Sequence, residues 1–200
     1  MRGKSFRETT EWFQCSISNA TCTGKPRILL TGDSITVRYY PVVSKLLQGA
    51  AHCAYFSTSA AIADPVYLKQ IAPLFEGYEY RVIHFNNGLH GFDCTEDEYR
   101  AGYEKTLEFI RKKAPAAKLI LALSTPLQAG SRDARLNPRV DARNRIVREL
   151  AGTFSLEINN LYSLTKNRPE LHSDPYHHNE QGVSLQAKQV ADKIRSLLVR

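Results

Sequence analysis

Arg27-Ile28-Leu29-Leu30-Thr31-Gly32-Asp33-Ser34 is an apolar run that ends in a glycine, a carboxylate and a hydroxyl. A short apolar run of this kind predicts a buried strand over residues 27–31. Helical spacing follows over residues 37–48, with the apolar side chains on one side. The stretch therefore predicts a strand that turns tightly into a helix, with Ser34 beside the turn.

The alternation of strand and helix continues to the end of the chain. Further strands are expected over residues 52–56, 80–85, 118–123 and 154–158, and helices over residues 65–75, 96–113, 137–151 and 180–198. Such alternation predicts a parallel sheet with helices on both faces. We therefore predict an α/β fold: a three-layer α/β/α sandwich around a five-stranded parallel sheet in flavodoxin-like order.

Length and composition indicate one globular domain. The chain has 200 residues, of which 42% are hydrophobic and 24% charged. Residues 1–26 are rich in Ser and Thr and are interpreted as an amino-terminal extension, with residues 27–200 as the domain. No apolar stretch is long enough to predict integral membrane association. The polar first ten residues predict no signal peptide and favour a cytoplasmic location, with secretion as the alternative if a leader has been removed.

The net charge of +7 is interpreted as a solvated surface with surplus arginine. The basic residues are scattered, so no nucleic-acid partner is predicted, and the oligomeric state stays open. The densest basic group is expected to be a solvated helical face, interrupted at Pro138. Its members are Arg132, Arg135, Arg139, Arg143, Arg145 and Arg148.

The four cysteines contain no CxxC pair, which argues against a zinc knuckle or a thioredoxin-type site. Cys53 lies in an apolar run and is expected to be a core residue. Cys15 and Cys22 lie in the polar extension and could form a disulfide in an oxidising compartment.

Three residues have the chemistry of a nucleophilic triad. In a parallel sheet, ligands bind beyond the carboxyl ends of the strands, where Ser34 is expected. Asp174 and His177 are three residues apart, so the carboxylate can hold one ring nitrogen while the other takes a proton from Ser34. The alternative for Ser34 is a turn with a capping serine. The alternatives for Asp174 and His177 are an acidic residue at a helix start beside an exposed histidine, or a metal site. The metal site would be formed by His172, Asp174, His177 and His178.

Residues after the third predicted strand could stabilise an oxyanion. The amide of Asn87 can donate hydrogen bonds without losing a proton, and Asn86 is the second choice. An Asn-Gly turn at Asn87-Gly88 is the alternative interpretation. His90 and Phe92 are expected at the rim, in contact with substrate.

These blocks resemble those of the SGNH hydrolase superfamily, the GDSL-type esterases. Gly32-Asp33-Ser34-Ile35 matches the first block, and Asp174, His177, Asn179 and Gly182 match the last. The third block is matched at Asn87 but lacks its leading glycine and trailing aspartate. In the second block Ala60 stands in place of glycine. The resemblance covers about residues 27–198, and its first and last blocks are specific when they occur together in this order.

The resemblance implies a serine esterase without metal or organic cofactor. Its triad would be Ser34, His177 and Asp174, and its oxyanion hole the amides of Ser34 and Ala60 with the side chain of Asn87. The chain has no inserted segment long enough for a deep acyl-chain lid, which favours short acyl groups such as acetyl. Several aromatic residues near the site could stack on a sugar ring, which favours a carbohydrate ester. They are Tyr39, Tyr40, Phe92 and Tyr176.

Two alternatives remain, because two blocks depart from the family pattern and because the sequence does not identify the substrate. Within the enzyme class, a small-molecule ester is possible as substrate, as in a lysophospholipase or thioesterase. From a different class, the altered second and third blocks fit a binding module that keeps the fold without the chemistry.

Overall fold

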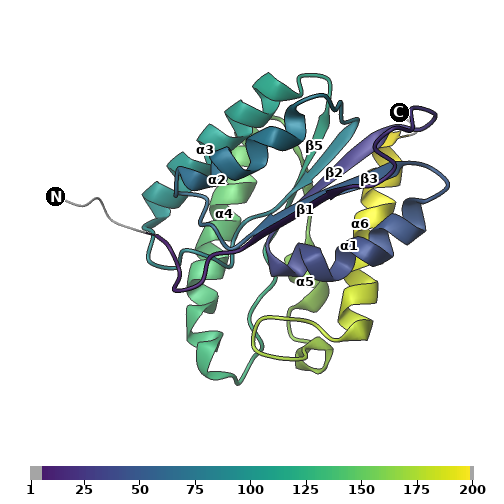
Figure 1. The fold of residues 1–200 in the computed structure, drawn as a ribbon. Helices are drawn as coiled ribbons and strands as arrows, with labels where there is room; N and C mark the ends of the chain where they lie inside the picture. The colour runs from purple at the N-terminus through teal and green to yellow at the C-terminus, as the bar shows by residue number, and fades with distance from the viewer. Residues whose placement is uncertain (1–5, 199–200) are drawn as a thin grey trace.

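The computed structural model describes residues 6–198, and its centre is a six-stranded sheet (Figure 1). Across the sheet the strands run in the order β1-β3-β2-β4-β5-β6. Their bounds are β1 (Phe13–Ile17), β2 (Arg27–Gly32), β3 (His52–Thr58), β4 (Val82–Phe85), β5 (Lys118–Ala122) and β6 (Glu157–Asn159). Strands β2 to β6 pair in parallel, in the predicted flavodoxin-like order.

Five strands were predicted, and the additional strand is β1. It pairs antiparallel with β3, so that Phe13 lies opposite Thr58 and Ile17 lies opposite Ala54. Four of its five residues are exposed, because it lies at the edge of the sheet. An exposed edge strand has no continuous apolar run, which is why the sequence pattern did not reveal it.

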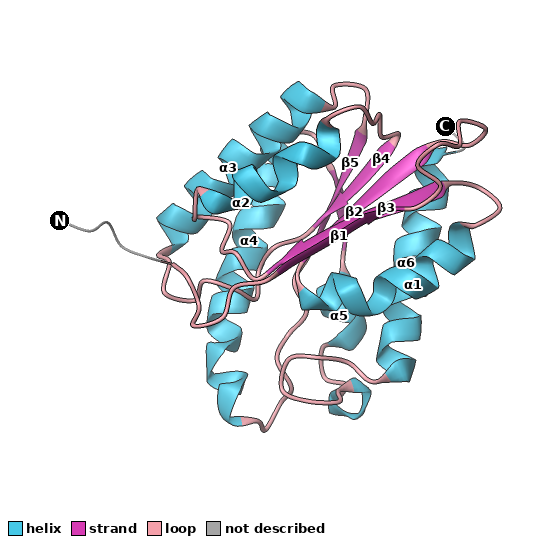
Figure 2. Cartoon of the chain, in the orientation of Figure 1, coloured by secondary structure: helices cyan, strands magenta, loops and turns pink. Residues whose placement is uncertain are grey.

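Residues 6–198 also contain six α-helices, of which α5 and α6 follow the last strand (Figure 2). They are α1 (Ser34–Leu47), α2 (Val66–Ile71), α3 (Glu96–Lys113), α4 (Asn137–Thr153), α5 (Leu161–Thr165) and α6 (Glu180–Leu198). The helix predicted over residues 65–75 is divided, since a 3₁₀ turn at Ala72–Phe75 follows α2. The last strand begins at Glu157, later than predicted, and the short helix α5 was missed.

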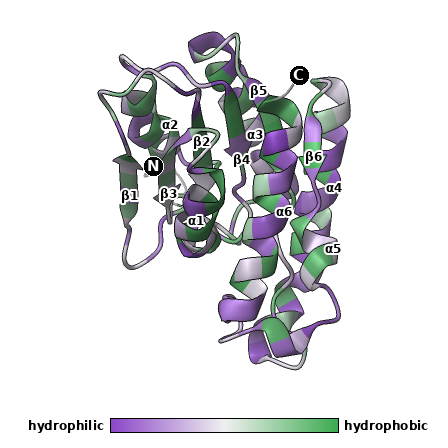
Figure 3. Cartoon of the chain, turned by 90° about the vertical axis from the view of Figure 1, so that its right-hand side faces the viewer, coloured by the Kyte–Doolittle hydropathy of each residue, from purple (hydrophilic) through white to green (hydrophobic). Residues whose placement is uncertain are grey.

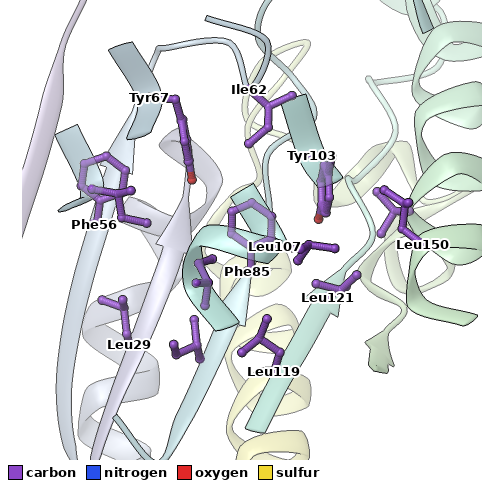
Figure 4. Packing of buried hydrophobic residues seen from close by; sticks show 14 of the residues in the cluster. Leu29, Phe56, Ile62, Tyr67, Phe85, Tyr103, Leu107, Leu119, Leu121 and Leu150 are labelled. Atoms are coloured by element: carbon purple, nitrogen blue, oxygen red, sulfur yellow. The ribbon is translucent and has the colours of Figure 1, made fainter. Parts of the chain in front are cut away.

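Helices cover both faces of the sheet, so the three-layer prediction is confirmed (Figure 1). Alternate residues of a strand point to opposite faces. On β2, Leu29 packs under α2, α3 and α4, whereas Ile28 and Leu30 pack under α1 and α6. Figure 4 shows Leu29 with Phe85 and Leu121 in the first of these layers.

Strands and helices differ in how their hydrophobic residues are arranged (Figure 3). Strand β2 is buried along its whole length, whereas α4 and α6 carry both hydrophobic and polar residues. The start of α3 is fixed by a reciprocal capping box between Thr95 and Glu98. No helix within residues 6–198 is sufficiently long and apolar to span a membrane.

Candidate active site

Ser34 begins α1 at the carboxyl end of β2. Gly32 is required there, since a Cβ on it would lie 2.1 Å from Thr36 Oγ1. Asp33 is buried, and its Oδ1 caps the helix by accepting a hydrogen bond from the Ile35 amide at 3.0 Å. The strand, the turn and the cap therefore present the Ser34 hydroxyl at the sheet edge.

Asp174 and His177 lie in a tight turn before α6. The His177 carbonyl accepts a hydrogen bond from the Ser173 amide at 2.9 Å, which closes the turn. Within it, Asp174 Oδ1 accepts hydrogen bonds from the amides of Tyr176 at 2.9 Å and His177 at 2.8 Å. The aspartate is therefore held by the backbone of the histidine that it contacts.

Asn179 and Gly182 fix the turn against α6. Asn179 Oδ1 accepts a hydrogen bond from the Gly182 amide at 3.1 Å, and its Nδ2 donates to the Glu170 carbonyl at 2.7 Å. A Cβ on Gly182 would lie 2.8 Å from both the Leu171 carbonyl oxygen and His178 Cβ, so the close approach requires glycine. These contacts give a physical reason for both residues in the last sequence block.

The structure brings Ser34, His177 and Asp174 together, although 143 positions separate the serine from the histidine. Ser34 Oγ lies 2.8 Å from His177 Nε2, and His177 Nδ1 lies 2.8 Å from Asp174 Oδ2. Burial opposes ionisation of Asp174. The hydrogen bonds from the His177 and Tyr176 amides and from the His177 ring outweigh it, lowering the pKa of Asp174 to about 2. Asp174 is therefore a carboxylate at neutral pH.

Asn87 and Ala60 lie side by side, as an oxyanion site requires. Asn87 Nδ2 donates to the Ala60 carbonyl at 3.1 Å, and the Asn87 carbonyl accepts from the Tyr99 hydroxyl at 2.6 Å. The Ala60 amide donates to Thr58 Oγ1 at 3.0 Å, so it would have to exchange this partner to bind an oxyanion. Both residues are buried.

Asn86, the second choice, points elsewhere. Its Nδ2 donates to the Ala122 carbonyl at 2.8 Å and to Ser124 Oγ at 3.3 Å, so both of its amide protons have partners. Asn86 thus ties β4 to the end of β5, and Asn87 is the better placed of the two.

The predicted substrate contacts have different surroundings. His90 is half-buried, and its Nδ1 lies 2.6 Å from Glu8 Oε1. Tyr176 is half-buried within the turn that holds Asp174 and His177. Phe92 packs against the guanidinium of Arg143 at 4.7 Å. Tyr39 is a correction: it is 1% exposed and shares a hydrogen bond with Thr36, so it belongs to the core and cannot stack on a sugar.

Arg143 is a second correction, because it is not part of a solvated face. It is 1% exposed, and its guanidinium donates to the carbonyls of Gly88 at 2.7 Å, His90 at 2.8 Å and Gly91 at 2.5 Å. It also lies 4.9 Å from the centre of the Tyr99 ring. The loop after Asn87 has carbonyls that no strand or helix satisfies, and the arginine supplies their donors. Sequence spacing carries no signal for such a contact.

Replacing Arg143 with Met is expected to lower the free energy of unfolding by about 2–4 kcal/mol, because the Gly88 and His90 carbonyls lose their buried donor and the Gly91 carbonyl keeps the Cys94 amide. Urea unfolding measures the change. Arg148→Met is the matched control, since this arginine is exposed on the same helix and should change the value by less than about 0.5 kcal/mol. Equal effects of the two substitutions would contradict the role of Arg143.

The residues weighed as metal ligands do not converge. Within residues 6–198, no three His, Cys, Asp or Glu side chains form a group that could hold a metal ion. His172 and His178 stack on each other instead, with ring centroids 4.4 Å apart. Burial and the neighbouring His172 and His177 rings lower the pKa of His178 to about 3. Cys15 and Cys22 are free thiols with no disulfide between them, and Cys53 is buried as predicted.

The chain is similar to solved structures of esterases and lipases. A carbohydrate esterase family 3 protein from Talaromyces cellulolyticus has a TM-score of 0.71 and 15% identity, covering 87% of this chain and 98% of that one. An acetylxylan esterase from Geobacillus stearothermophilus has a TM-score of 0.68 and 16% identity, covering 86% and 94%. A lipolytic G-D-S-L family protein from Veillonella parvula has a TM-score of 0.68 and 16% identity, covering 83% and 96%.

Neither the protein-family models nor the curated protein sequences contain a match to this chain. At identities of 15–16%, the structural likeness establishes the fold. The chain therefore has the fold of GDSL-type lipases and esterases, as the sequence blocks predicted.

Proposed function

We propose that the protein is a serine esterase that removes short acyl groups, in particular acetyl, from a carbohydrate. The single observation that carries this proposal is the hydrogen-bonded series from Ser34 Oγ through His177 to Asp174, at 2.8 Å for each step. The fold shared with lipases and esterases supports the same class of reaction.

The proposed reaction has two halves. Ser34 Oγ attacks the ester carbonyl carbon while His177 Nε2 takes the hydroxyl proton. His177 then gives that proton to the leaving alcohol, and the acyl group stays on Ser34. A water molecule attacks the acyl carbon, again losing its proton to His177, and the acid leaves as Ser34 regains its proton. Asp174 accepts a hydrogen bond from His177 Nδ1 throughout, which fixes the tautomer.

Negative charge on the carbonyl oxygen needs donors in both halves. We assign this role to the amides of Ser34 and Ala60 and to Asn87 Nδ2, each donor contributing about 2.7–4 kcal/mol in comparable sites. Asn87 supports the assignment because only one of its two amide protons is used by the Ala60 carbonyl. The Ala60 amide would leave Thr58 Oγ1 as the oxyanion forms.

The substrate part of the proposal rests on two observations. His90, Phe92 and Tyr176 are half-buried, and they offer apolar ring surface together with hydrogen-bonding groups on His90 and Tyr176. The structural neighbours include a carbohydrate esterase and an acetylxylan esterase, and the names of both refer to esters of carbohydrates. Both favour an acetylated sugar over a long-chain lipid.

Acyl-length selectivity tests the proposal. The purified protein is expected to hydrolyse p-nitrophenyl acetate with a kcat/KM at least about tenfold above that for the octanoate, because the chain has no inserted segment long enough to cover a long acyl group. Butyrate should fall between the two. Preference for octanoate would support a lipase-type substrate instead, and turnover of none of the three would favour the non-catalytic binding module.

A further inference from the structure

The segment of residues 8–12, here called the amino-terminal arm, leads into β1 and lies beside the candidate active site. The Trp12 amide donates to Ser59 Oγ at 2.9 Å. The Trp12 carbonyl accepts from the Ser59 amide at 3.0 Å and from Thr58 Oγ1 at 3.1 Å. Ser59 precedes Ala60, so main-chain contacts fix the end of the arm next to the assigned oxyanion site.

Side chains of the arm contact a rim residue of the site. The Trp12 ring meets the His90 ring edge to face, with centroids 6.2 Å apart and planes at 77°. Glu8 Oε1 lies 2.6 Å from His90 Nδ1. Burial opposes protonation of His90, but the hydrogen bond to Glu8 and the carboxylates of Asp33, Glu8 and Glu11 together raise its pKa. Glu8 and His90 therefore form a charge-assisted pair.

The two ends of the arm are therefore fixed on different loops. Glu8 contacts His90 in the loop after β4, and Trp12 contacts Ser59 in the loop after β3.

We propose that the amino-terminal arm forms one wall of a subsite for the sugar part of the ester, with the Trp12 ring packing against a pyranose. The wall offers the two features that an acetylated sugar needs, an apolar ring face and a charged hydrogen-bonding pair for hydroxyl groups. Trp12 is half-buried, and the Glu8 side chain is 44% exposed, so both have surface available to a ligand. This inference rests on the proposed esterase function.

Trp12→Ala separates this role from a purely structural one. The contacts that fix the arm use the main chain of residue 12, so the variant keeps them. For acetylated xylo-oligosaccharide we expect KM to rise at least about tenfold with little change in kcat, since only sugar binding is lost. For p-nitrophenyl acetate, which has no sugar, both constants should stay within about twofold.

Phe13→Ala is the matched control. Phe13 is the next residue, is 58% exposed, and points to the opposite side of the extended chain. The Phe13→Ala variant should have unchanged kcat and KM for both substrates. The inference is overturned if Trp12→Ala slows both substrates equally, or if it leaves the sugar ester unchanged. It is also overturned if the wild type hydrolyses p-nitrophenyl acetate but no acetylated xylo-oligosaccharide, whereas failure on both substrates overturns the esterase proposal itself.

Intrinsic fluorescence gives a readout that does not depend on catalysis. The chain has one tryptophan, so all tryptophan emission comes from Trp12. Titrating the Ser34→Ala variant with acetylated xylo-oligosaccharide should change this emission in a saturable way. Binding detected by calorimetry without any change in emission would place the sugar elsewhere and contradict the inference.

Discussion

Ser34→Ala is expected to reduce kcat for p-nitrophenyl acetate by about 10⁴- to 10⁶-fold, the range that loss of the nucleophile causes in other serine hydrolases. The reason is that no other hydroxyl is held at hydrogen-bond distance from His177 Nε2 among the contacts of residues 6–198. KM should change much less, because the hydroxyl contributes little to binding of the ground state. Steady-state kinetics with purified variant and wild type measures both values.

Ser44→Ala serves as the control for this substitution. Ser44 is half-buried and lies on the same helix, α1, ten residues after Ser34. It should retain activity within about twofold. If Ser34→Ala keeps more than about a tenth of the wild-type kcat, Ser34 is not the nucleophile.

Asp174→Asn is expected to reduce kcat by about 10⁴-fold, as the equivalent change does in other triads. Asp174 Oδ1 accepts from the Tyr176 and His177 amides, and Oδ2 faces His177 Nδ1. In the variant, the amide oxygen would keep the two backbone donors, so the NH₂ group would face Nδ1. The proton of the neutral ring would then move to Nε2, which could no longer accept the Ser34 proton.

Asp133→Asn is the control for the loss of a carboxylate near the site, because Asp133 interacts with Tyr176, the residue before His177. It should leave kcat within about threefold of the wild type. Circular dichroism and thermal unfolding of both variants check that the turn before α6 remains folded. A kcat for Asp174→Asn within tenfold of the wild type would show that the carboxylate does not set the tautomer.

The parallel part of the fold could be predicted because its signals are local. Buried strands such as β2 are continuous apolar runs, and helices such as α3 carry both apolar spacing and charged ends. Strand β1 could not be predicted in this way, since its residues are mostly exposed and its pairing with β3 is set by tertiary contact.

The same distinction between local signals and tertiary contacts applies to the residues of the site. Ser34, Asp174 and His177 could be proposed from short motifs because each motif also has a local structural purpose, as a helix start or a tight turn. Arg143 and Trp12 could not, because their roles depend on residues more than 40 positions away in the chain. In the sequence alone, Arg143 and Trp12 look like ordinary surface residues, because the loops that they contact are far away in the chain.

The nucleophilic role of Ser34 is tested most directly by covalent labelling. A fluorophosphonate reacts with a serine only where a neighbouring base activates the hydroxyl. Mass spectrometry of the treated protein is expected to find one phosphonyl group, on Ser34, and none in Ser34→Ala, with labelling of His177→Ala slowed by at least about a hundredfold. Labelling at another residue, or labelling of Ser34 at the same rate without His177, would contradict the account.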